Sequence, residues 1–202
     1  MKFAAVVLAA GRSTRMQANK LLADLNGKPL LANTIEQIRA SGVDEIVVVT
    51  GHDAEAVAAA LSHMKVVIIH NPQYAGGLST SVRCGIAAVK NFDATFICLG
   101  DMPLIRAADM QRMMQVFNVE QGRILIAPTY RGQLGNPVLW GREHFIALMA
   151  LEGDRGARRL LEANREKITE IAVDHDGILL DADTPEALAE IRRRPLDRVF
   201  RP

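Results

Sequence analysis

The feature that most restricts the fold of this chain is a regular alternation of short apolar runs with longer segments of helical periodicity. The apolar runs occupy residues 3–7, 45–50, 65–70, 94–99 and 123–128. The helical patterns between them cover residues 29–41, 54–61, 82–90 and 107–118. Strands that alternate with helices in this way form parallel βαβ units with helices on both faces of a sheet. The sequence therefore predicts an α/β fold, a single-domain Rossmann-like three-layer sandwich with a mostly parallel sheet.

The last third of the sequence adds shorter elements. We expect a short strand within residues 130–139, a helix after the segment 152–159, and a strand at 168–173 with a partner strand at 178–180. Thr184 or Asp183 is suited to cap a final helix, with Pro185 in its first turn. We assign residues 1–191 to one domain. Residues 192–202, with five arginines, form a basic tail that is either a solvated end or a docking site for a partner.

Composition limits the classes of function. With 202 residues, 49% of them hydrophobic, the chain can bury a large core in one domain. A formal net charge of +1 gives no overall field that attracts nucleic acid or an anionic membrane. No apolar run approaches the ~18 residues of a membrane span. Residues 1–10 form either a signal peptide or, as we prefer, the first buried strand, so we expect a cytoplasmic protein.

The two cysteines lie inside apolar runs of a chain that has no other cysteine. Cys84 and Cys98 are therefore expected to be reduced, buried thiols, with a reactive Cys84 as the alternative.

A loop of small residues and cations follows the first predicted strand. It contains Leu8, Ala9, Ala10 and Gly11, and then Arg12, Arg15 and Lys20. Small residues let the backbone approach a ligand closely, while backbone N–H groups and cations bind phosphate oxygens. A P-loop is excluded because Met16 stands where its second glycine is needed, and a dinucleotide fingerprint is excluded because only Gly11 is present. The loop predicts a triphosphate cradle.

Two further segments follow predicted strands and are expected at the same edge of the sheet. Ligands of such sheets bind at this edge, at the carboxyl ends of the strands. The first contains Gly77, Ser79 and Ser81 and is either an ordinary helix cap or a contact to a nucleotide base. The second is Asp101, directly after the apolar run 94–99. A carboxylate there either caps the following turn or binds Mg²⁺ together with substrate phosphates, and the nearby cradle favours Mg²⁺.

Several motifs together resemble those of one family, the MobA-like nucleotidyltransferases. Its signature is Ala-Ala-Gly or Ala-Gly-Gly, then Arg-Met-Gly and Lys, with Gln17 here in place of the last glycine. The other matching segments are Asn71-Pro72 to Ser81, Gly100-Asp101-Met102-Pro103, Gly135-Asn136-Pro137, Gly153-Asp154 to Arg158, and Asp181-Ala182-Asp183-Thr184-Pro185. The chain is most similar to the molybdenum cofactor cytidylyltransferases within this family.

The resemblance implies a fold of the nucleotide-diphospho-sugar transferase type and a set of site residues. It implies nucleotide binding by Leu8, Ala9, Ala10, Gly11, Arg12, Arg15, Lys20, Gly77, Leu78, Ser79 and Ser81. It implies substrate binding by Gly135, Asn136, Pro137, Asp154, Gly156 and Arg158. It implies that Asp101 and Asp183 hold Mg²⁺, with Asp181 beside them. Arg15, Lys20 and Asp101 would be the catalytic residues, the two cations neutralising the leaving pyrophosphate.

The activity implied is transfer of CMP from CTP to the terminal phosphate of the molybdenum-molybdopterin cofactor. Ala10 favours CTP because its methyl group would crowd a purine, whereas Leu8 departs from the threonine of cytidylyl-transferring relatives. CTP and the molybdopterin cofactor are thus the expected partners, followed by a recipient molybdoenzyme or its chaperone. The alternatives are transfer of GMP, transfer to another phosphorylated acceptor such as a sugar phosphate, and a non-catalytic carrier of the cofactor.

Overall fold

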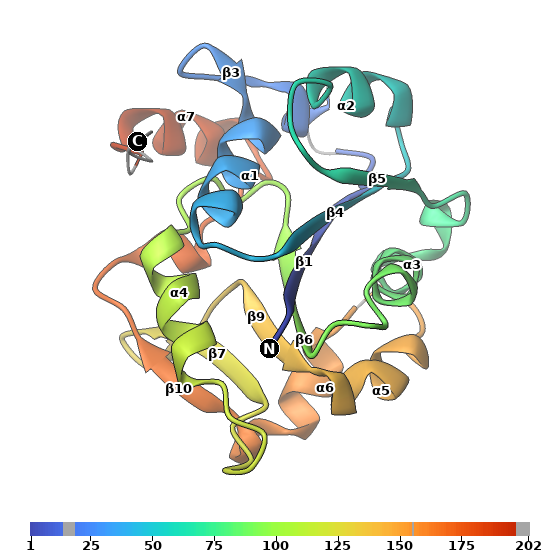
Figure 1. Cartoon of the computed structure of the whole chain (residues 1–202). Helices are drawn as coiled ribbons and strands as arrows, with labels where there is room; N and C mark the ends of the chain where they lie inside the picture. Colours follow the sequence, from blue (N-terminus) through green and yellow to red (C-terminus); the bar gives the residue numbers. More distant parts are fainter. Residues whose placement is uncertain (14–18, 155, 197–202) are drawn as a thin grey trace.

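The computed structural model describes residues 1–13, 19–154 and 156–196. Within them, one sheet has the strand order β10-β7-β9-β6-β1-β4-β5, and β8 pairs with β7 at one end (Figure 1). Its strands are β1 (Phe3–Ala9), β4 (Glu45–Thr50), β5 (Val67–His70), β6 (Ala94–Leu99), β7 (Leu125–Tyr130), β8 (Gln133–Leu134), β9 (Val138–Gly141) and β10 (Thr169–Ala172). β9 runs antiparallel to both neighbours, and β8 antiparallel to β7. The remaining pairs are parallel, which confirms the predicted mostly parallel sheet.

Helices cover both faces of this sheet. On one face, α1 (Leu30–Ala40), α2 (Ala54–Ala60) and α4 (Ala107–Val116) contribute to a core that includes Val7, Phe96 and Cys98. On the other, α3 (Leu78–Ala88), α5 (Phe145–Met149) and α6 (Arg158–Ala163) contribute to a core that includes Val6 and Val49. Successive strand residues point to opposite faces, so Val6 and Val7 belong to different cores. This arrangement is the predicted three-layer sandwich.

A third, smaller core joins the last helix to a hairpin near residue 25. Helix α7 (Pro185–Arg193) packs through Leu188 and Ile191 on a hairpin of β2 (Asp24–Leu25) and β3 (Lys28–Pro29). The Thr184 hydroxyl accepts a hydrogen bond from the backbone N–H of Ala187, so it is the predicted cap of α7. At the end of α7, Arg192 donates to the carbonyl oxygen of Asp24.

Several elements differ from the prediction, among them helix α5, which is not among the predicted helices, and the segment 130–139, which contributes to two strands, β8 and β9, rather than one. Helix α3 begins at Leu78 rather than at residue 82, because Gly77 ends the preceding turn with φ 101° and the chain becomes helical directly after it. Residues 24–29 form the β2–β3 hairpin, with Asn26 and Gly27 at positive φ, before α1 begins. The predicted strand at 178–180 is wrong, because residues Asp176–Leu179 form the 3-10 helix η5.

The two cysteines differ in burial, and the helices differ in length and apolar character. Cys98 is buried and Cys84 is partly buried, both are free thiols, and burial raises the pKa of each. A raised pKa lowers the fraction of reactive thiolate, which favours the inert interpretation of Cys84. In the part of the chain that the structure describes, no helix combines the length and apolar character needed to cross a membrane.

Gly85 of α3 provides a test of the packing between α3 and the sheet. A Cβ at Gly85 would lie 2.2 Å from Val6 Cγ1, a stiff and fully buried side chain. We expect Gly85→Ala to lower the free energy of unfolding by about 1–3 kcal/mol, despite the helix propensity of alanine. Urea denaturation of Gly85→Ala, Val6→Ala and the double variant measures this. Overpacking predicts that Val6→Ala restores part of the loss, whereas simple addition of the two single effects would contradict it.

Candidate nucleotide and metal site

A cavity of about 430 Å³ opens at the carboxyl ends of β1 and β6. Leu8 of β1 pairs with Leu99 of β6, so the residues that follow the two strands emerge side by side. The cavity is lined by Leu8, Ala10, Gly11, Arg12, Lys20, Leu21, Tyr74, Ala75, Gly77, Leu78, Ser81, Leu99, Asp101, Asp154, Asp181 and Asp183. The small-residue loop, the segment before α3 and the predicted metal ligands therefore meet in one place.

The Lys20 ammonium lies between two carboxylates at the end of this cavity. Its Nζ donates hydrogen bonds to Asp101 Oδ2 and Asp183 Oδ1. The exposed fractions of the three side chains are 14% for Lys20, 11% for Asp101 and 32% for Asp183. Charge-assisted hydrogen bonds of this kind compensate for taking the two carboxylates partly out of water. Segments 81 and 163 residues away from Lys20 are thus joined by one cation.

Backbone contacts fix the position of each member of this group. The N–H of Gly100 donates to the Leu8 carbonyl, and its own carbonyl accepts from the Thr34 hydroxyl, which places Asp101 at the end of β6. The Ala182 N–H donates to the Asp101 carbonyl at 3.0 Å, which places the flanking residues Asp181 and Asp183 next to Asp101.

Lys20 is itself held at the start of the 3-10 helix η1 (Lys20–Leu22). The Asn19 side chain caps this helix by accepting from the Leu21 N–H, and the Lys20 N–H donates to the Ser13 hydroxyl. The predicted catalytic residue Arg15 lies outside the described residues.

The pKa shifts follow from this arrangement. Burial alone would lower the pKa of Lys20, but attraction and hydrogen bonds from Asp101 and Asp183 outweigh it and raise the pKa above its ordinary value. Lys20 is therefore a cation at neutral pH. The pKa of Asp181 is raised, first by burial and then by repulsion from Asp101 and Asp183, with Lys20 opposing the shift. Three carboxylates are close enough to interact and have one ammonium among them.

These residues fit a divalent cation. Mg²⁺ is typically held by one or two carboxylates, water and substrate phosphates rather than by a complete protein cage. Asp101 and Asp183 provide two carboxylates on opposite sides of a positive charge, which Lys20 supplies in this structure. Among residues 1–13, 19–154 and 156–196, no three His, Cys, Asp or Glu side chains form a ready-made metal cluster. A metal here would complete its coordination with water and with oxygens of a bound nucleotide.

Arg12 and Tyr74 form one wall of the cavity. The Arg12 guanidinium lies over the Tyr74 ring, 5.6 Å from its centre. Tyr74 and Ala10 both lie close to Gly51, where a Cβ would be 2.5 Å from Tyr74 Cβ and 2.8 Å from Ala10 Cβ. Sequence reasoning missed the role of Tyr74 in orienting Arg12, and the signal for it was its place in the family segment before α3.

Gly77 and the start of α3 lie against Gly153 and Asp154 beside the cavity. Ser79 N–H donates to the Gly153 carbonyl at 3.2 Å, and a Cβ at Gly77 would lie 2.5 Å from Asp154 Oδ1. The Ser81 hydroxyl, which lines the cavity, accepts from the Asn71 side chain at 3.0 Å. Ser79 is buried beside the cavity and does not line it.

The residues expected to bind the second substrate are divided between different places. Asp154 lines the cavity, and Gly156 packs on Leu78. The cavity is not lined by Gly135, Asn136 or the cis-linked Pro137. Gly135 packs on Ile178, and the Asn136 N–H donates to the Ile178 carbonyl at 2.9 Å. Arg158 is 81% exposed and pairs with Glu162 on its own helix.

Comparison with known proteins gives a family and a set of structural relatives. The model of the MobA-like NTP transferase domain matches residues 5–168. The bifunctional protein GlmU of Syntrophomonas wolfei is 31% identical over 144 residues, which cover 70% of this chain and 31% of that protein. The chain thus spans about 30% of the length of the curated relatives that it matches.

Solved structures cover the chain almost completely. Rv0371c from Mycobacterium tuberculosis superimposes with a TM-score of 0.84 at 28% identity, covering 96% of this chain and 98% of that one. A nucleotidyl transferase from Methanothermobacter has a TM-score of 0.83 at 26% identity, with 95% and 96% covered. Rv0371c has also been solved in complex with manganese, with a TM-score of 0.78 at 29% identity and 95% and 98% covered. These neighbours confirm the expected fold of the nucleotide-diphospho-sugar transferase type.

Substitution of Lys20 tests whether the carboxylates accept a metal ion. Lys20→Met leaves Asp101, Asp181 and Asp183 without their common cation, so we expect the variant to be less stable than wild type. We also expect Mn²⁺ to raise the melting temperature of the variant more than that of wild type. An ion that binds only the folded state adds about 1.4 kcal/mol for each tenfold excess over its Kd. Lys28→Met, which breaks the surface pair with Glu36, is the matched control. Equal Mn²⁺ responses in the two variants would show that the carboxylates do not bind the ion.

Proposed function

The chain belongs to the MobA-like NTP transferase family and is a nucleotidyltransferase of that type, and we propose that it transfers CMP from CTP to the terminal phosphate of the molybdenum-molybdopterin cofactor. An oxygen of the acceptor phosphate attacks the α-phosphorus of CTP. The bond from that phosphorus to the β-phosphate oxygen breaks, and pyrophosphate leaves. The product is molybdopterin cytosine dinucleotide.

The observation that carries this proposal is the group formed by Lys20, Asp101 and Asp183 at the end of the cavity. It combines a cation from the triphosphate loop with two carboxylates suited to a metal, at the sheet edge where α/β proteins bind nucleotides. Such parts act by positioning and charge stabilisation, which is how phosphoryl-type transfer is catalysed. An acceptor phosphate is already ionised at neutral pH, so no general base is required for the attack.

The residues that line the cavity suggest how the nucleotide and its metal ion are held. Gly11, Arg12 and Lys20 line the cavity, where they would meet the triphosphate, and Arg15 is proposed to join them. Asp101 and Asp183 would hold Mg²⁺, which when bound neutralises charge on the triphosphate. Lys20 would then exchange its carboxylate partners for phosphate oxygens and stabilise the departing pyrophosphate. The manganese complex of Rv0371c supports a divalent ion in this type of protein.

The choice of CTP rests on the wall around Ala10. Ala10 is 7% exposed and lines the cavity, and its methyl group lies close to Gly51, on which Tyr74 also packs. A rigid wall cannot recede to admit a larger base, because tightly packed side chains have no room to move. This supports a pyrimidine as the preferred base.

The reaction is tested by pyrophosphate release with Mg²⁺ and the molybdopterin cofactor, comparing CTP, GTP, ATP and UTP. We expect release with CTP and a loss on the order of 100-fold in Asp101→Asn, since a charged group that stabilises the reacting phosphates is removed. Asp93→Asn, which changes an exposed carboxylate paired with Arg142, serves as the control. Pyrophosphate release by Asp101→Asn at the wild-type rate would exclude Asp101 from catalysis, and release with another nucleotide would assign a different transferase. No release by wild type with any of the four nucleotides would favour a carrier.

Ala10→Gly tests base selection separately. Removing the methyl group enlarges the cavity beside Tyr74, so we expect the ratio of kcat/KM for GTP to that for CTP to rise on the order of tenfold. Steady-state kinetics with both nucleotides measures the ratio. An unchanged ratio would mean that Ala10 does not select the base.

A further inference from the structure

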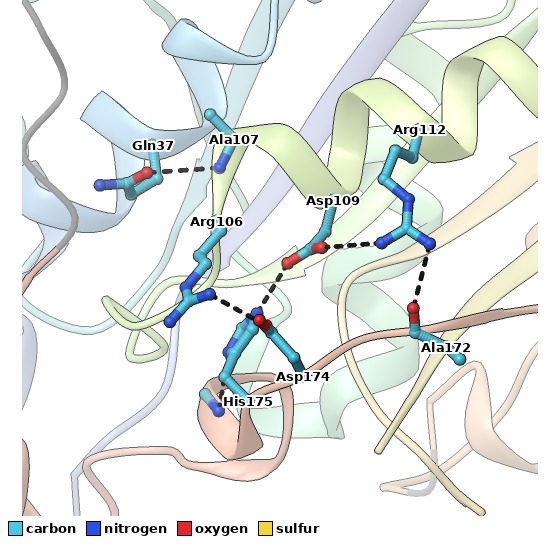
Figure 2. Close-up of polar contacts among 9 residues, drawn as sticks. Gln37, Arg106, Ala107, Asp109, Arg112, Ala172, Asp174 and His175 are labelled. Atoms are coloured by element: carbon cyan, nitrogen blue, oxygen red, sulfur yellow. Dashed lines mark hydrogen bonds and ion pairs between the residues drawn. The ribbon is translucent and has the colours of Figure 1, made fainter.

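A polar network on the sheet face opposite α3 links α4 to the chain that leads into Asp181 and Asp183 (Figure 2). At its centre, His175 Nε2 lies 2.7 Å from Asp109 Oδ2, and the two side chains are only 10% and 13% exposed. The other ring nitrogen, Nδ1, accepts a hydrogen bond from the Gly177 N–H at 3.1 Å. A ring that accepts at Nδ1 carries its proton at Nε2, so His175 donates to Asp109. Both nitrogens of His175 are thus used inside the protein.

The turn that His175 caps presses on the loop after Asp101. A Cβ at Gly177 would lie 2.4 Å from the Leu104 carbonyl oxygen and 2.9 Å from His175 Nδ1. Leu104 follows Asp101 by three residues, and Asp183 follows Gly177 by six. The two segments meet again where the Ala182 N–H donates to the Asp101 carbonyl. The turn at Gly177 and the Ala182 bond therefore fix the two carboxylate-bearing segments against each other at two points.

Helix α4 is the support for this arrangement. Arg112 donates to the Ala172 carbonyl at 3.1 Å and lies 3.7 Å from Asp109, so it holds both the end of β10 and the partner of His175 (Figure 2). Asp109 thus has a positive neighbour on one side and the His175 N–H on the other. Arg106 pairs with Asp174, but the Asp174 side chain is 88% exposed, where such a pair contributes little.

We propose that His175, held by Asp109, is a positioning residue for the metal-binding carboxylates. By fixing the Gly177 turn on Leu104, it sets the separation of Asp101 and Asp183 and so the affinity of the site for a divalent cation. His175 does not line the cavity and touches no substrate. The proposal deepens the proposed function and rests on it for the kinetic readout only.

Two variants separate the two bonds of the ring. In His175→Asn the side-chain oxygen can replace Nδ1 as the acceptor for Gly177, whereas the contact with Asp109 is lost. In His175→Gln the longer amide can reach Asp109, but it does not cap the turn. Asp174→Asn removes the exposed neighbouring pair with Arg106 and is the matched control.

The first readout is the Mg²⁺ concentration at half-maximal pyrophosphate release. We expect His175→Gln to raise it on the order of tenfold, the usual size for loss of a residue that orients metal ligands. KM for CTP and the melting temperature should change little. His175→Asn should show a smaller shift, because it keeps the cap and loses only the contact with Asp109, whereas Asp174→Asn should stay close to wild type. A general loss of stability would instead lower the melting temperature without this selective shift.

The second readout, hydrogen-deuterium exchange of residues 176–183, does not require activity. We expect faster exchange there in His175→Gln than in His175→Asn, with β1 and β4 unchanged in both. Wild-type exchange and wild-type Mg²⁺ dependence in His175→Gln would overturn the proposal. If His175→Gln does not fold, His175→Ala, which also removes the cap, is measured in the same way, and the same two results decide. Absence of pyrophosphate release by wild type would contradict the proposed function alone, because exchange still tests the positioning role.

Discussion

The arrangement of this site depends on the electrostatic problem created by three neighbouring carboxylates. Asp101, Asp181 and Asp183 line one partly buried cavity, and burial together with repulsion from the other two carboxylates raises the pKa of Asp181. Like charges at such a distance are unfavourable unless a cation lies among them. Lys20 is that cation in the described structure, and its own pKa is raised in return. The carboxylates therefore require a cation beside them, and a metal ion bound with a nucleotide can replace the Lys20 ammonium in that position.

The parallel sheet brings these groups together. Lys20, Asp101 and Asp183 come from three distant parts of the chain, and no local structure could bring them into contact. The central position of β1 between β4 and β6 places the triphosphate loop beside Asp101. Helix α7 and the β2–β3 hairpin share a small core around Leu25 and Ala182, so the loop that carries Asp183 is anchored to the segment directly after Lys20. The fold thus provides both a phosphate-binding loop and a fixed set of carboxylates at one edge.

Sequence patterns predicted the main sheet and the carboxylates but not the partners of individual side chains. The apolar runs at β4 and β6 have the observed bounds, because buried strands of this kind carry an unbroken hydrophobic signal. The β2–β3 hairpin has two-residue strands, which are too short to show a period of two. Ile178 resembled part of a strand because it is apolar, yet it is buried in η5 against Gly135. His175 had no metal-ligand spacing, and its contact with Asp109 arises only when α4 and η5 meet.

The most direct measurement is an anomalous difference map from crystals grown with Mn²⁺ and a non-hydrolysable CTP analogue. We expect a manganese peak in contact with Asp101 and Asp183 and the triphosphate, with Lys20 moved from the carboxylates to phosphate oxygens. A bound nucleotide with Lys20 still between the two carboxylates, and no manganese beside them, would contradict it.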